Sequence, residues 1–101
     1  MNKYIDIAKE ISLKHFSDID IEIFLFGSRA DGSEFENSDI DIGLLGNKGI
    51  SKNKINRLYE KLEESIVPYH IDIIDFFNVN DEFKRIALHN KTVWKRKKNI
   101  N

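Results

Sequence analysis

FGSR at positions 26–29 and DIDI at positions 39–42 decide the fold of this chain. The second segment begins ten residues after the arginine of the first. Gly27 allows the backbone to turn sharply or to approach a ligand closely. The second segment alternates as a strand does, so Asp39 and Asp41 are expected on one face, with Cα atoms roughly 7 Å apart. Two carboxylates held this close together favour a bound cation.

The composition is that of an ordinary globular protein, with 41% hydrophobic residues, 33% charged residues and a formal net charge of -1. A chain of 101 residues is expected to form one domain, over residues 1–101. The absence of cysteine excludes disulfide and thiolate metal sites. No apolar run typical of a signal peptide or a membrane span is present, so the sequence predicts a cytoplasmic protein.

Hydrophobic periodicity predicts alternating helices and strands. Helical spacing occurs at 4–16, 51–66 and 80–87, strand-like runs occur at 21–26, 39–45 and 70–77, and 92–94 is expected to be a short strand or a packing segment. The second helix is expected to begin after Ser51 and to be ended by Pro68, and the third to turn Phe83, Ile86 and Ala87 inward. The expected fold class is therefore α/β, of the α+β type, with one small mixed sheet and helices packed on one face.

The tripeptide Ile-Asp-Ile occurs three times, at 19–21, 40–42 and 71–73. Such alternation by itself usually indicates a half-buried strand with a solvated face, and we interpret Asp18 and Asp20 in this way. The second copy differs because it follows a Gly-Ser turn, on a strand expected to pair antiparallel with 21–26. The third copy adds Asp72, whereas Asp75 is expected to face the opposite side of its strand.

These segments resemble the minimal nucleotidyltransferases of the DNA polymerase beta-like superfamily. The family pattern is an apolar strand ending in Gly-Ser, a spacer of about a dozen residues, Asp-apolar-Asp-apolar, and a third Asp on a later strand. Here Gly27-Ser28, Asp39, Asp41 and Asp72 occupy those positions. The resemblance extends over nearly the whole chain and implies the polymerase beta-like fold.

The resemblance implies a nucleotidyl transfer in which two Mg²⁺ ions stabilise the attacking and leaving oxygens. Asp39, Asp41 and Asp72 are then the catalytic and metal-binding residues, with Asp72 also placed to help deprotonate the attacking hydroxyl. Gly27, Ser28 and Arg29 are the expected nucleotide-binding residues, and the family suggests ATP as substrate.

The roles of two nearby residues have more than one interpretation. Arg29 can contact the triphosphate, or it can form a surface ion pair. His70 lies two residues before Asp72 and faces the same side, but we interpret it as structural.

Larger nucleotidyltransferases surround this core with helical domains, so the resemblance predicts that a partner supplies one. The implied function is that of an antitoxin that transfers AMP from ATP to a tyrosine of a helical HEPN-type toxin. One alternative is a binding protein that neutralises its partner by occlusion. Another is a subunit of an antibiotic-type nucleotidyltransferase that acts on a small molecule.

Basic residues surround Trp94 near the end of the sequence: Lys91, Lys95, Arg96, Lys97 and Lys98. Such a cluster can contact nucleic acid, but we interpret it as a solvated segment. The remaining residues then carry about six net negative charges, which argues against a broad nucleic-acid-binding face.

Overall fold

The computed structural model describes residues 2–32 and 38–98, so part of the expected connection at 30–38 lies outside the described residues. The described residues form, in chain order, α1 (Lys3–His15), β1 (Glu22–Phe26), α2 (Ser28–Asp31), β2 (Ile40–Leu45), α3 (Lys52–Glu63), β3 (Ile71–Asp75), α4 (Asp81–His89) and β4 (Thr92–Lys95). The structure therefore confirms the expected alternation of helices and strands, and 92–95 is a strand.

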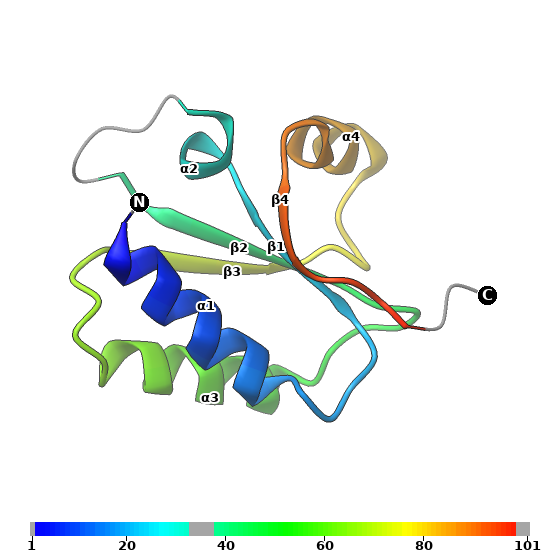
Figure 1. Ribbon diagram of the computed structural model, residues 1–101. Helices are drawn as coiled ribbons and strands as arrows, with labels where there is room; N and C mark the ends of the chain where they lie inside the picture. The colour runs from blue at the N-terminus through cyan, green and yellow to red at the C-terminus, as the bar shows by residue number, and fades with distance from the viewer. Residues whose placement is uncertain (1, 33–37, 99–101) are drawn as a thin grey trace.

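The strands form a mixed sheet in the order β3-β2-β1-β4, and helices lie above and below it (Figure 1). β1 pairs antiparallel with β2 and with β4, whereas β2 and β3 are parallel and are joined through α3. The register places Phe26 opposite Asp41 and Asp41 opposite Asp72. The expected mixed sheet is confirmed, and its pairing brings the end of β1 and the starts of β2 and β3 together.

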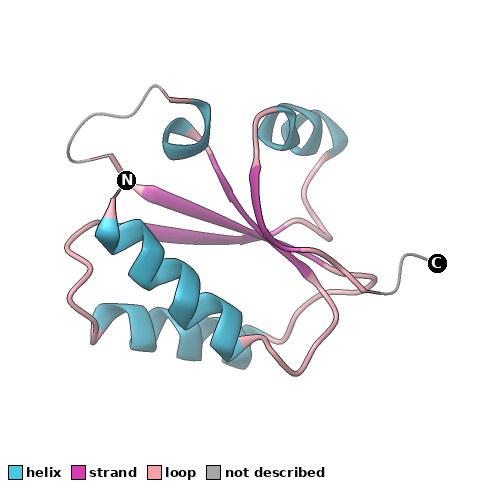
Figure 2. Cartoon of the chain, in the orientation of Figure 1, coloured by secondary structure: helices cyan, strands magenta, loops and turns pink. Residues whose placement is uncertain are grey.

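One face of the sheet carries the main hydrophobic core, which lies between the sheet and the helices α1 and α3 (Figure 2). Alternate strand residues point into it, as the period of two in a strand requires. The buried side chains of this core are Ala8, Phe16, Ile21, Ile23, Leu25, Ile40, Ile42, Leu44, Leu58, Leu62 and Ile73. Side-chain caps begin the helices: the Asn2 side chain accepts from the amide of Tyr4, and the Ser51 hydroxyl accepts from that of Lys54.

The opposite face carries a second, aromatic cluster of Phe24, Phe26 and Phe76, all buried. Ala87 and Leu88 of α4 pack against this cluster, so the expectation of helices on one face holds for α1 and α3 but not for α4. The physical reason is that β1 is apolar on both sides, and its second face also needs cover.

Two details of the helices differ from the sequence prediction. α3 ends at Glu63, before Pro68, because the Ser65 hydroxyl donates to the carbonyl of Leu62 and accepts from the amide of Val67, which closes a turn. In α4, Ile86 is 61% exposed instead of facing inward. The inner face of α4 is centred on residues 87 and 88, and a neighbouring helical position lies about 100° around the axis.

Among the described residues, no helix combines the length and the apolar character that crossing a lipid bilayer demands.

Candidate functional site

The carboxylates predicted from the sequence meet at one end of the sheet. Asp41 on β2 lies directly beside Asp72 on β3, and Asp39 precedes the first residue of β2. These residues point to the face that carries the aromatic cluster, because Ile40 and Ile42 between them face the main core. The parallel pairing of β2 and β3 thus brings together the three aspartates that the sequence singled out.

The charges of this group repel one another. The pKa of Asp41 is raised above the ordinary value of 3.8, first by partial burial of its carboxyl and then by the nearby charges of Asp72 and Asp39. His70 acts in the opposite direction and lowers this pKa. A cation bound among the carboxylates would relieve the repulsion.

His70 belongs to the same group. Its Nε2 lies 3.1 Å from Oδ1 of Asp72, and one ligand atom from each of Asp39, His70 and Asp72 lies within 4.8 Å of the others. The sequence analysis placed His70 on the face of Asp72 from their spacing of two residues, and the structure agrees. Its interpretation of His70 as structural did not include a position among the ligand atoms of the acidic group.

The turn predicted at Gly27 lies against this cluster. Gly27 has φ 75° and ψ -156°, a conformation that is almost restricted to glycine. A Cβ atom at Gly27 would overlap Oδ2 of Asp41, so the missing side chain also allows the turn and the carboxylate to approach each other. Ser28, the next residue, begins the single-turn helix α2. The predicted phosphate-holding turn and the predicted metal ligands are therefore neighbours.

Arg29 is half-buried, and its guanidinium group bonds within the protein. Its Nε and one of its terminal nitrogens donate to the carbonyl of Ser38, at 3.1 and 2.7 Å. Its guanidinium carbon lies 4.4 Å from the centre of the Tyr69 ring. The sequence alternatives of triphosphate contact or ion pair did not include this arrangement, and nucleotide binding by Gly27, Ser28 and Arg29 stays a prediction.

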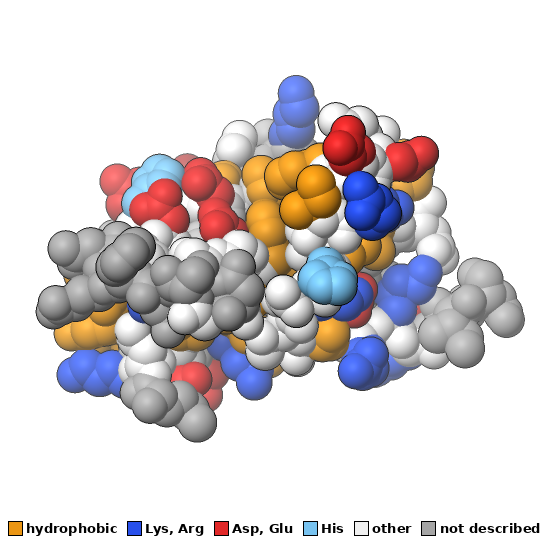
Figure 3. Space-filling view, turned by 90° about the horizontal axis from the view of Figure 1, so that it is seen from above, with side chains coloured by type: hydrophobic (Ala, Val, Ile, Leu, Met, Phe, Trp, Pro, Cys, Tyr) orange, Lys and Arg blue, Asp and Glu red, His pale blue; other side chains and the backbone are white. Residues whose placement is uncertain are grey.

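A cavity of about 540 Å³ opens beside the Gly27 turn, which is within the range of small-ligand sites. Its walls come from the end of β1 and from α4: Phe26, Gly27, Phe83, Arg85, Ile86, Ala87, His89 and Asn90. Seen from above, acidic side chains gather next to a hydrophobic patch on this face of the molecule (Figure 3). The arrangement therefore offers an apolar hollow adjoining a group of carboxylates.

Aspartates outside this group have other partners. Asp75 faces away from the cluster as expected, and its carboxylate accepts from the backbone amides of Ile50 and Phe77. Asp18 and Asp20 precede β1 and are not part of a strand, which corrects their sequence interpretation. Asp18 pairs with Lys54 at 2.9 Å, and Asp20 accepts from the backbone amide of Lys98.

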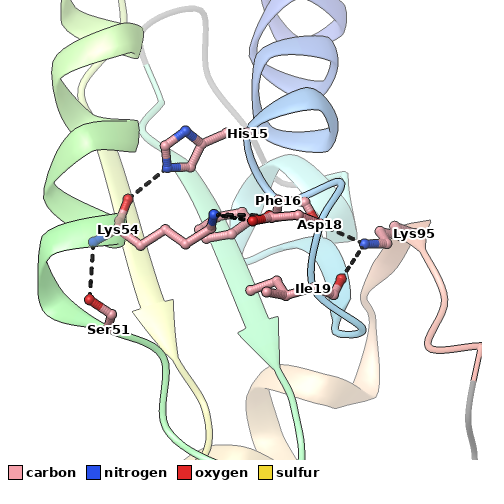
Figure 4. A network of polar contacts seen from close by, with 7 residues as sticks. All are labelled: His15, Phe16, Asp18, Ile19, Ser51, Lys54 and Lys95. Atoms are coloured by element: carbon pink, nitrogen blue, oxygen red, sulfur yellow. Dashed lines mark hydrogen bonds and ion pairs between the residues drawn. The ribbon is translucent and has the colours of Figure 1, made fainter.

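The basic residues near Trp94 also bind within the protein. Lys91 pairs with Glu22 at 2.9 Å, and the ammonium of Lys97 donates to Asn47. Lys95 donates to the carbonyls of Phe16 and Ile19, at 2.9 and 2.7 Å, in a network that also joins His15 and Asp18 to α3 through Lys54 (Figure 4). Three of the five basic side chains thus tie this segment to the rest of the fold, whereas Arg96 and Lys98 are exposed, as expected of a solvated segment.

Lys95→Met is expected to lower the free energy of unfolding by about 1–3 kcal/mol, because two carbonyls lose a charged donor while the aliphatic stem is kept. Urea unfolding followed by circular dichroism measures the change. Lys98→Met is the matched control, since Lys98 is exposed and contributes its backbone amide to Asp20, and we expect a change within about 0.5 kcal/mol. Equal stabilities of the two variants would contradict a structural role for Lys95.

The donor set of the cluster fits a hard divalent cation. Asp39 and Asp72 supply carboxylate oxygens to the group whose ligand atoms lie within 4.8 Å of one another, and Mg²⁺ prefers such oxygens to nitrogen or sulfur. Asp41 lies beside Asp72 but outside that group, and metal binding by Asp39, Asp41 and Asp72 together stays a prediction. His70 instead pairs with Asp72 and can orient that carboxylate.

Comparisons with known proteins agree with this geometry. Residues 10–99 match the family model described as polymerase beta, nucleotidyltransferase. The probable protein adenylyltransferase MntA of Haemophilus influenzae is 28% identical over 67 residues, which are 66% of this chain and 59% of that protein. The chain therefore matches less than two thirds of the length of this curated relative.

Solved structures share the fold at low sequence identity. A toxin-antitoxin crystal structure with AMP-PNP has a TM-score of 0.70 at 22% identity, over 89% of this chain and 74% of that one. A chain in the solved structure of a tri-AMPylated Shewanella oneidensis HEPN toxin in complex with MNT antitoxin matches this chain with a TM-score of 0.65 at 19% identity. The match covers 91% of this chain and 72% of that one. With the family model covering most of its length, this chain belongs to the polymerase beta nucleotidyltransferase family.

Proposed function

We propose that this protein is an Mg²⁺-dependent nucleotidyltransferase that transfers AMP from ATP to a tyrosine hydroxyl of a HEPN-type toxin and so acts as its antitoxin. The observation that carries the proposal is the pairing of Asp41 with Asp72 beside the Gly27 turn. The names of similar proteins support the acceptor class, since one is a probable protein adenylyltransferase and another is an MNT antitoxin found with an AMPylated toxin. The cytoplasmic location stays a prediction from the sequence.

The three aspartates and Ser28 each have a part in this reaction. Asp39, Asp41 and Asp72 would hold two Mg²⁺ ions, which supply charge stabilisation at the attacking and leaving oxygens. The Ser28 hydroxyl and nearby backbone amides donate to the β- and γ-phosphate oxygens. A carboxylate oxygen of Asp72 accepts the tyrosine proton as the phenolic oxygen bonds to the α-phosphorus. The bond from that phosphorus to the bridging oxygen breaks, and pyrophosphate leaves.

The cavity between the Gly27 turn and α4 would accommodate the nucleoside of ATP. It adjoins the proposed phosphate-binding turn, and its walls offer aromatic and aliphatic surface to a planar base. The exposed side chain of Ile86 forms part of this wall.

Ile86→Glu is expected to raise the KM for ATP about tenfold with little change in kcat, because the charge opposes both the apolar contact and the triphosphate. Steady-state kinetics at varied ATP measures both parameters. Ile66→Glu is the matched control, since Ile66 is 69% exposed and lies outside the cavity wall. A similar KM for the two variants would place the nucleoside elsewhere.

The alternative is neutralisation by binding alone. Phe83 and Ile86 are exposed apolar side chains, 41% and 61% accessible, in the wall of the cavity beside the Gly27 turn. Such side chains favour a protein partner, but an occluding surface does not require the three clustered carboxylates.

The mass of the partner distinguishes the two functions. A coexpressed HEPN-type protein is incubated with this protein, Mg²⁺ and ATP, and its intact mass is measured with and without the Asp39→Asn and Asp41→Asn substitutions. We expect a gain of one or more AMP groups with the wild type alone. A tight complex without any gain in mass would replace the proposed transferase with a binding antitoxin.

A further inference from the structure

Arg29 connects three segments that lie far apart in the sequence. From α2, its guanidinium donates two hydrogen bonds to the carbonyl of Ser38, the residue immediately before Asp39. The same group lies over the ring of Tyr69, the residue immediately before His70. One side chain thus contacts the chain just before both segments that carry the clustered carboxylates.

Tyr69 is itself fixed from the other side. Its ring meets that of Tyr4 edge to face, with centroids 5.8 Å apart, and its hydroxyl accepts from the Asn2 side chain at 3.4 Å. Figure 1 shows the N-terminal end of α1 at the same side of the molecule as the starts of β2 and β3. The N-terminal turn of α1 therefore supports the ring on which Arg29 stacks.

The two segments are also joined directly where the parallel pairing begins. The amide of Ile40, the first residue of β2, donates to the carbonyl of His70 at 2.9 Å. Asp39 immediately precedes Ile40, and Asp72 follows His70 by two residues. Arg29 contacts Tyr69, the residue before His70, and Ser38, which lies two residues before Ile40. Both contacts of Arg29 therefore lie close to the hydrogen bond that joins the two segments.

We propose that Arg29 is a positioning residue that, stacked on Tyr69 and bonded to the Ser38 carbonyl, sets the spacing of Asp39 and Asp72 for a divalent cation. This inference deepens the proposed function and rests on its metal site. The carboxylates repel one another, so an external clamp is needed to keep them close before the cation binds. Lysine cannot replace arginine here, since it lacks the planar group that both stacks and donates in a fork.

The test uses the full chain and Mn²⁺ alone as the probe, without nucleotide. Arg29→Lys and Tyr69→Leu are each expected to raise the Kd for Mn²⁺ about 10- to 100-fold, the usual effect of removing a group that orients ligands. The double variant is expected to be little worse than either single variant, because both substitutions break the same clamp. Titration followed by electron paramagnetic resonance of free Mn²⁺ measures the Kd.

Two variants serve as controls. Tyr69→Phe keeps the ring beneath Arg29 and is expected to retain the wild-type Kd for Mn²⁺. Arg57→Lys makes the same chemical change at an exposed position of α3 and should have no effect. Circular dichroism confirms that each variant is folded before titration. Additive losses in the double variant would overturn the shared clamp.

Amide hydrogen exchange at Ile40 supplies a readout that does not depend on metal or activity. We expect faster exchange in Arg29→Lys and Tyr69→Leu than in the wild type, because the Ile40 bond to His70 opens more often. If Arg29 instead contacts the triphosphate, Arg29→Lys will lose ATP affinity with unchanged Mn²⁺ affinity and unchanged exchange, which overturns the proposal. A wild type that binds no Mn²⁺ would defeat the proposed metal mechanism, and the exchange at Ile40 would then decide the clamp by itself.

Discussion

The Asp39→Asn, Asp41→Asn double variant is expected to lose AMP transfer by at least about a thousandfold, with the complex with the partner retained. The substitutions keep the shape of both side chains but remove the charges that would hold Mg²⁺, and charge stabilisation by the metal contributes several kcal/mol to such a reaction. The measurement is incorporation of labelled AMP into the partner under single-turnover conditions.

Asp81→Asn is the matched control for this loss. Asp81 is an exposed residue of the first turn of α4, outside the acidic cluster. We expect nearly wild-type transfer, since the substitution removes one carboxylate charge at a helix N-terminus, which is a small change in stability. Transfer by the double variant at the rate of this control would exclude the metal mechanism.

The same double substitution that removes activity should not lower the stability of the metal-free protein. The raised pKa of Asp41 means that its charged form is disfavoured in the folded protein without metal. The folded state therefore binds more protons than the unfolded state, and this unfavourable contribution disappears as the pH falls through the raised pKa. At neutral pH in EDTA, we expect the double variant to match or slightly exceed the wild type in urea unfolding. This advantage should shrink in acid, and a less stable double variant at neutral pH would contradict the repulsion among the carboxylates.

Gly27→Ala is expected to lower both stability and transfer. A side chain at φ 75° and ψ -156° costs about 1–3 kcal/mol of backbone strain, and its Cβ would displace the Asp41 carboxylate. Because a ligand displaced by about 1 Å can cost a hundredfold in rate, we expect transfer to fall at least about that much. Urea unfolding and single-turnover transfer measure the two effects.

Gly32→Ala separates strain from displacement. Gly32 also has a positive φ, 83°, but a Cβ there would meet no atom of the described residues within 4 Å. We expect this variant to lose about 1 kcal/mol of stability and to keep its transfer rate. Comparable losses of transfer in the two glycine variants would show that general destabilisation, and not the position of Asp41, limits the reaction.

Much of the candidate site could be predicted because its signals are local. The glycine turn, the alternation of Asp39 and Asp41, and the helix cap at Ser51 each depend on a few neighbouring residues. The end of α3 was predicted wrongly, because a nearby side chain ends the helix before the proline does. The hydroxyl of Ser65 closes a turn that ends α3 before the predicted stop at Pro68.

Other features depend on residues far apart in the chain. His70 has no motif of its own, and its proximity to Asp39 follows from the pairing of β2 with β3. Likewise, Arg29 contacts a backbone carbonyl and a tyrosine ring from separate segments. A charged side chain in a loop has several partners of similar energy, and packing of the surrounding segments selects among them.

By itself, the sequence determined the class of elements, the turn at Gly27 and the common face of Asp39 and Asp41, because backbone conformation and a period of two fix these within one segment. Only the tertiary structure decided that Asp41 lies beside Asp72, that α4 covers the second face of the sheet, and that Lys95 binds within the fold. The register of distant segments is set by burial of side chains from both, so no single segment carries that information.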